Sequence, residues 1–147
     1  MTVRLLIAGD SYTLAESRDD GARLIALLPR GAEALLGSAH PVDEARLEAG
    51  IEIAEDWLMP HTARLRGEVL EVLDASHRLK AGLRDVLSVT TNEWRVEDIE
   101  RFFLTLVEMT TGRTPAPVLQ SRSAFIADLL LLRELAHHGR LNRITLS

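Results

Sequence analysis

The stretch VRLLIAGDSYT, residues 3–13, decides how the fold begins. Its first six residues are apolar apart from one arginine, and a glycine follows, which is typical of a buried strand. Thr13 and Glu16 then have the spacing of a capping box, in which the side chain of each residue accepts a hydrogen bond from the backbone N–H of the other. We therefore expect a strand over residues 3–8 and a helix that begins at Thr13 and ends before Pro29.

The composition favours helices for the rest of the chain. At 147 residues the chain has the size of one domain that can bury a core. Only 4% of the residues are aromatic, so the core consists mainly of Leu, Ala, Ile and Val. We expect a single helical domain over residues 1–147, mainly α, folded as a compact bundle of five or six helices. The end segments, residues 3–8 and 141–146, can form a small sheet.

The middle of the chain has a long helical pattern. Apolar residues recur in steps of three, four or seven over residues 42–87. One helix of that length would measure about 70 Å at a rise of roughly 1.5 Å per residue, which is too long for a compact domain. Pro60 lacks an amide hydrogen and should break it. We expect two or three helices here, and the alternative is one long helix that pairs with a second copy.

The most apolar helix is expected at residues 124–136. Its nearly all-round apolarity indicates the centre of a bundle or a subunit interface. Asp128 interrupts it, and a buried carboxylate must be paired, for which Arg122 or Arg133 is available. The longest apolar run, residues 124–132, is too short to span a bilayer.

The segment GDSYT, residues 9–13, resembles the first block of the GDSL/SGNH hydrolase family. In that family the serine is the nucleophile, and its backbone N–H helps to form the oxyanion hole, so the resemblance implies a nucleophilic role for Ser11. The family's base lies in an Asp-x-x-His block near the C-terminus. Asp74 and His77 have this spacing but lie in mid-chain, and the family's later glycine and Gly-x-Asn-Asp blocks are absent. The alternative is that the segment only joins a strand to a helix cap.

A metal site has one candidate pair. If the helix continued through Pro60, His61 would fall on its apolar stripe, with Glu68 beside that stripe two turns on. A metal-binding bundle needs several more such ligands, and the alternative is that Glu68 pairs with Arg64. We therefore expect no metal and no other cofactor.

Charge and composition limit the partners. The net charge of -5 disfavours nucleic-acid binding, although the basic stretch over residues 77–84 can contact phosphate or form a solvated face. The absence of cysteine suits a reducing compartment, and the N-terminus lacks the pattern of a signal peptide. We expect a cytoplasmic protein without a membrane partner.

The function expected from these patterns is a non-enzymatic interaction, regulatory or assembly module. A non-enzymatic role is expected because no complete catalytic set is present. The module would act through an apolar helix face, as a homodimer or with another protein. Two alternatives remain. One is a small serine hydrolase that uses Ser11, and the other is a metal-binding helical bundle.

Overall fold

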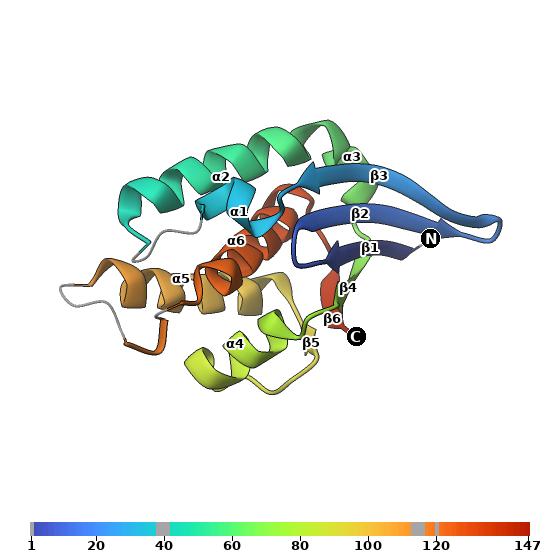
Figure 1. The fold of residues 1–147 in the computed structure, drawn as a ribbon. Helices are drawn as coiled ribbons and strands as arrows, with labels where there is room; N and C mark the ends of the chain where they lie inside the picture. Colours follow the sequence, from blue (N-terminus) through green and yellow to red (C-terminus); the bar gives the residue numbers. More distant parts are fainter. Residues whose placement is uncertain (1, 38–41, 113–116, 120) are drawn as a thin grey trace.

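The computed structural model describes residues 2–37, 42–112, 117–119 and 121–147. The chain forms a six-stranded mixed sheet in the order β3-β2-β1-β4-β6-β5, with helices packed against it (Figure 1). The strands are β1 (Thr2–Ile7), β2 (Ser11–Arg18), β3 (Gly21–Pro29), β4 (Val69–Asp74), β5 (Glu93–Trp94) and β6 (Arg143–Leu146). The helices are α1 (Ala32–Leu36), α2 (Glu44–Leu58), α3 (Thr62–Leu65), α4 (Arg78–Leu87), α5 (Val96–Thr111) and α6 (Ser123–His138), with short 3-10 helices at Met59–His61 and Pro117–Leu119.

The expectation of a mainly helical bundle is wrong, because the segment after the first turn forms a hairpin. In β2 the buried residues alternate with half-buried ones, so Tyr12, Leu14 and Glu16 share the inner face. β2 pairs antiparallel with β1 on one side and with β3 on the other. Glu16 does not cap a helix: its carboxylate is buried and lies 2.9 Å from the guanidinium of Arg18.

The long helical pattern of residues 42–87 is interrupted by a strand. α2 ends at Leu58, and Pro60 lies in the 3-10 helix that follows, so the predicted break occurs there. The chain then enters β4, which buries every second residue. β4 runs parallel to both β1 and β6 and lies between them. Both end segments are therefore strands of one sheet, but they do not pair directly with each other.

The helices cover one face of the sheet. α6 is buried over most of its length and contacts α1, α2, α4 and α5, so it forms the centre of the helical layer (Figure 1). Its run of four leucines, Leu129 to Leu132, is fully buried, and each such side chain contributes about 1.5–3 kcal/mol through removal from water. The opposite face of β1 and β4 is more open and carries the ion pair between Arg4 and Glu71.

Within the described ranges, none of the helices combines the length and the apolar character needed to cross a membrane.

Candidate active site at the ends of strands β1 and β4

Two loops meet at the edge of the sheet where the parallel strands β1 and β4 end. The register places Ile7, the last residue of β1, opposite Asp74, the last residue of β4. The backbone N–H of Ala75 donates to the carbonyl of Ile7 at 3.1 Å and so holds the β4–α4 loop against the β1–β2 turn. In sheets of this kind, ligands bind outside the carboxyl ends of the strands. We call this place, formed by residues 9–11 and 75–77, the strand-end edge.

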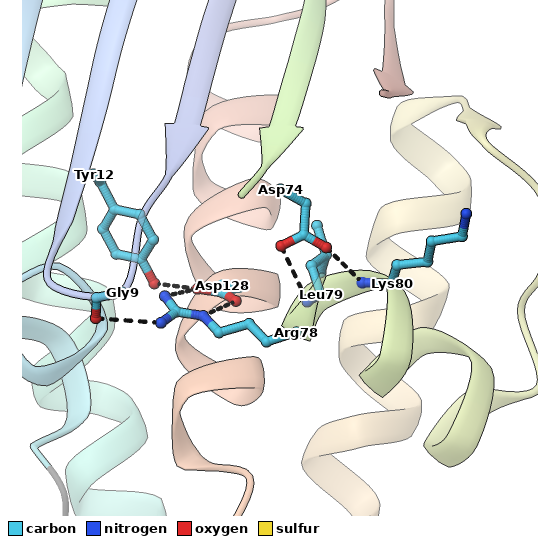
Figure 2. Close-up of polar contacts among 7 residues, drawn as sticks. All are labelled: Gly9, Tyr12, Asp74, Arg78, Leu79, Lys80 and Asp128. Atoms are coloured by element: carbon cyan, nitrogen blue, oxygen red, sulfur yellow. Dashed lines mark hydrogen bonds and ion pairs between the residues drawn. The ribbon is translucent and has the colours of Figure 1, made fainter. Parts of the chain in front are cut away.

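Asp74 fixes the start of α4. Its buried carboxylate accepts hydrogen bonds from the backbone N–H groups of Leu79 at 3.4 Å and Lys80 at 2.9 Å (Figure 2). These amides have no partner inside the helix, and the positive end of the helix dipole favours a carboxylate there. The carboxylate of Asp74 is therefore engaged by α4 rather than by the imidazole of His77. His77 is exposed, and its backbone is in the left-handed conformation with a φ of 60°.

A buried polar cluster lies directly below this edge. Figure 2 shows Tyr12 from β2, Arg78 from α4 and Asp128 from α6 converging on one point. The Tyr12 hydroxyl donates to Asp128 Oδ1 at 2.6 Å, and Arg78 donates from Nε and Nη2 to the two carboxylate oxygens at 2.8 Å each. Burial raises the pKa of Asp128 to about 6, while the hydrogen bonds from Arg78 and Tyr12 act in the opposite direction. Burial, followed by the charge of Asp128, raises the pKa of Tyr12.

The cluster positions the β1–β2 turn. Arg78 Nη1 also donates to the carbonyl of Gly9 at 3.4 Å, so one guanidinium joins the turn, α4 and α6. Arg78 makes its two short hydrogen bonds to Asp128, so we assign it a positioning role at the strand-end edge.

The prediction that Asp128 is buried and paired is confirmed, but its partner is neither of the arginines expected. Arg122 pairs with Asp85 at 3.1 Å, and Arg133 pairs with Glu100 at 2.9 Å. Arg78 belongs to the basic stretch of residues 77–84, which is visible in the sequence as a run of cationic side chains. The sequence alone does not show that this stretch faces α6.

Ser11 lies at the rim of the same edge. Side chains alternate along a strand, so Ser11 points to the face opposite Tyr12, away from the buried cluster. A surface hollow of about 500 Å³ adjoins Ser11 and is also lined by Asp10, Arg30 and Glu33. Arg30 and Glu33 form an ion pair of 3.0 Å at the side of this hollow.

The three predicted catalytic residues all lie at or beside the strand-end edge, but they do not form a hydrogen-bonded triad. Within the described part of the chain, no side-chain hydrogen bond joins Ser11, His77 and Asp74; His77 and Asp74 are linked only through their backbones, at 3.1 Å. Their catalytic roles remain predictions. The two predicted metal ligands lie in different elements. His61 is the last residue of the 3-10 helix after α2, and Glu68 immediately precedes β4. Their joint role in metal binding remains a prediction as well.

Comparison with known proteins relates the fold to a group of phosphatases. No protein-family model and no curated protein sequence matches the chain. Among solved structures, a PPX-GPPA enzyme from Aquifex aeolicus is 14% identical, with a TM-score of 0.69 over 99% of this chain and 52% of its own. An exopolyphosphatase from Cytophaga hutchinsonii is also 14% identical, with a TM-score of 0.64 over 100% of this chain and 53% of its own. An exopolyphosphatase-like protein is 10% identical, with a TM-score of 0.64 over 99% of this chain and 55% of its own.

These likenesses correct the function expected from the sequence. The chain spans about half the length of the proteins it resembles, and at these identities the likeness concerns the fold. A non-enzymatic interaction module was expected from the apolar helix at residues 124–136 and from the lack of a complete catalytic set in the sequence. That expectation is wrong, since the fold is α/β and its structural neighbours are enzymes. The chain has the fold seen in about half of each exopolyphosphatase and PPX-GPPA structure.

Proposed function

We propose that this chain is a phosphoanhydride hydrolase domain that acts on polyphosphate at the strand-end edge. The observation that carries the proposal is the fold shared over almost the whole chain with enzymes described as exopolyphosphatases. The place of the substrate follows from the general preference of ligands for the carboxyl ends of parallel strands. Because the chain spans about half of those enzymes, the activity of the whole enzyme is part of the proposal.

The strand-end edge offers donors for a terminal phosphate. The hydroxyls of Ser11 and Ser76 lie on its two loops, and His77 is exposed beside them. Arg30 is exposed and lines the hollow that adjoins Ser11, and Lys80 is exposed in the first turn of α4. Hydrogen bonds from charged donors to phosphate are about twice as strong as neutral ones. Local cations of this kind allow a protein with a negative net charge to bind a polyanion.

The proposed reaction is attack of water on the terminal phosphorus. The new P–O bond forms to the water oxygen, the terminal phosphoanhydride bond breaks, and the shortened polyphosphate leaves with the bridging oxygen. Asp10 is the carboxylate suited to accept the proton from water, since it is exposed on the β1–β2 turn. Asp74 is not suited, because its two oxygens already accept hydrogen bonds from α4.

Release of orthophosphate from polyphosphate tests the proposal. The purified chain is incubated with polyphosphate and magnesium, the usual counter-ion of such anions, and free phosphate is measured over time. Wild type should release phosphate, and Asp10→Asn should be slower by about a hundredfold, the typical contribution of a general base. Asp19→Asn is the matched control, because Asp19 lies in the turn between β2 and β3, at the far end of the hairpin (Figure 1). Absence of release by wild type, or equal loss in both variants, contradicts the proposal.

A further inference from the structure

We propose that the chain holds a second site, for a zinc ion, formed by Glu55 of α2 and by Glu134 and His138 of α6. Glu134 and His138 are four residues apart, so they lie on one face of α6 in adjacent turns. Glu55 faces them from α2, which packs against α6. The site is distinct from the predicted pair of His61 and Glu68.

The three ligand atoms are close enough to share one ion. His138 Nε2 lies 3.2 Å from Glu55 Oε1 and 3.0 Å from Glu134 Oε2. All three potential ligand atoms lie within 4.8 Å of one another. Zinc binds such atoms at about 2.0–2.2 Å in tetrahedral geometry, which separates neighbouring ligands by roughly 3.4 Å. A small outward movement of the side chains is enough to admit the ion.

A buried carboxylate oxygen aimed into the cluster supports a ligand there. Glu134 is 0% exposed. Its Oε1 accepts a hydrogen bond of 2.7 Å from Arg133, but its Oε2 has no hydrogen-bond partner among the described residues. His138 Nε2 is near, yet it meets hydrogen-bond geometry with Glu55 and not with Glu134. A ring nitrogen carries only one hydrogen, so it cannot satisfy both carboxylates well. A buried oxygen left in this state costs stability unless something binds it.

The charges around the cluster favour a divalent cation. The carboxylates of Glu55, Glu100 and Glu134 are linked through ion pairs to the single guanidinium of Arg133 and to the imidazole of His138. With a neutral imidazole, three negative charges face one positive charge, which leaves an excess of two negative charges. A divalent ion removes this excess and uses the neutral form of histidine, which is the form that binds metals.

The mixture of ligands indicates the class of metal. Imidazole suits zinc and neighbouring transition metals, whereas magnesium and calcium prefer sites made entirely of oxygen. Three protein ligands leave a fourth position for water or another ligand. The site is also separate from the strand-end edge, since His138 is ten residues beyond Asp128 on α6, about 15 Å along the helix axis.

Calorimetric titration of the whole chain with zinc tests this proposal. Wild type should bind one zinc per chain, and zinc should raise its Tm, because the ion binds only the folded state. His138→Asn and Glu55→Gln should weaken zinc binding at least tenfold and abolish the rise in Tm. Glu55 is partly exposed, so its variant is expected to fold. His137→Asn is the matched control, because His137 is the exposed neighbour on the same turn.

Three results would overturn the zinc site. Wild type could show no binding of zinc, it could bind magnesium as tightly as zinc, or His137→Asn could lose binding as much as His138→Asn does. None of these results depends on whether the chain cleaves polyphosphate, so the zinc site and the proposed function are tested separately.

Discussion

Arg78 and Asp128, separated by 50 residues in the chain, face each other through two hydrogen bonds of 2.8 Å. This contact joins α4 to α6, and the hydroxyl of Tyr12 attaches β2 to the same carboxylate. The position of the β1–β2 turn depends on it, since Arg78 also reaches the carbonyl of Gly9. Several measurable properties of the protein follow from this cluster and from the packing around it.

Removal of the Arg78 guanidinium should destabilise the fold strongly above the pKa of Asp128. In Arg78→Gln the buried carboxylate loses its cation, which typically costs about 3–5 kcal/mol of unfolding free energy. The cost should shrink at about pH 5, where Asp128 carries a proton. Urea denaturation at both pH values measures this difference. Arg84→Gln, which disrupts an exposed pair with Asp85, should have little effect; an equal effect of both variants contradicts the role of the buried pair.

Asp128 should also make the stability depend on pH. Its pKa in the folded protein is about 6, above the ordinary value of 3.8, so the folded state holds this proton more tightly than the unfolded state does. The stability gained from protonation is full below pH 3.8 and is lost as the pH rises through about 6. This shift corresponds to about 3 kcal/mol.

The measurement compares wild type with Asp128→Asn. Between about pH 4 and pH 7, the difference in unfolding free energy should move in favour of the variant by about 2–3 kcal/mol. Urea denaturation at closely spaced pH values gives this difference. A constant difference, or a movement in favour of wild type, shows that burial does not dominate at Asp128.

The stability of a variant at Gly82 should show how tightly α4 and α6 pack. A Cβ atom at this position would lie 2.2 Å from the ring of Phe125 on α6. Gly82→Ala should therefore destabilise the protein by about 1–3 kcal/mol through overpacking. In a free helix the same change stabilises by up to about 1 kcal/mol, so the sign of the effect is diagnostic. A rise in Tm for Gly82→Ala means that the two helices do not pack as described.

Ser11 should contribute to substrate affinity at the strand-end edge. Ser11→Ala removes one donor to phosphate, worth about 1–1.5 kcal/mol, so KM for polyphosphate should rise by about five- to tenfold. Ser17→Ala is the control, because Ser17 lies on the same face of β2 but about 20 Å away at a rise of 3.4 Å per residue. A similar KM for Ser11→Ala and wild type removes Ser11 from the proposed site.

The elements that sequence reasoning found are those with a strong local signal. The strand expected at residues 3–8 and the apolar helix that contains Asp128 are both present. Each is a nearly continuous apolar run, which can be detected from the segment itself. The tail strand was also predicted, although β4 separates it from β1.

The missed strands carry two patterns at once. In β3 the run LIALL contains three leucines and an alanine, which are good helix formers, and pairing with β2 selects the extended form. In β4, Leu70 and Val72 alternate with polar or half-buried residues, but the same segment also continues the three- and four-residue steps of α2. Strand pairing is a non-local interaction, so neither pattern can be chosen from the segment itself.

The candidate site also depends on non-local contacts that the sequence does not show. Sequence reasoning selected Ser11, Asp74 and His77 as a set from a family resemblance, and the fold places all three near one edge. The sequence does not show that the Asp74 carboxylate is hydrogen-bonded to α4, or that Arg78 is the partner of Asp128. Both facts depend on contacts made only in the folded chain. Glu134 and His138 had a visible signal, their spacing of four on one helix, but the third ligand comes from α2.

NMR can map where polyphosphate binds on this chain. Amide chemical shifts of the isotopically labelled chain are recorded by NMR during titration with polyphosphate. For a substrate site at the strand-end edge, we expect shifts concentrated at residues 9–11 and 75–77, with the amides around His138 unchanged. Shifts confined to other parts of the chain, or no shifts at polyphosphate concentrations that saturate known enzymes of this type, contradict a substrate site at the ends of β1 and β4.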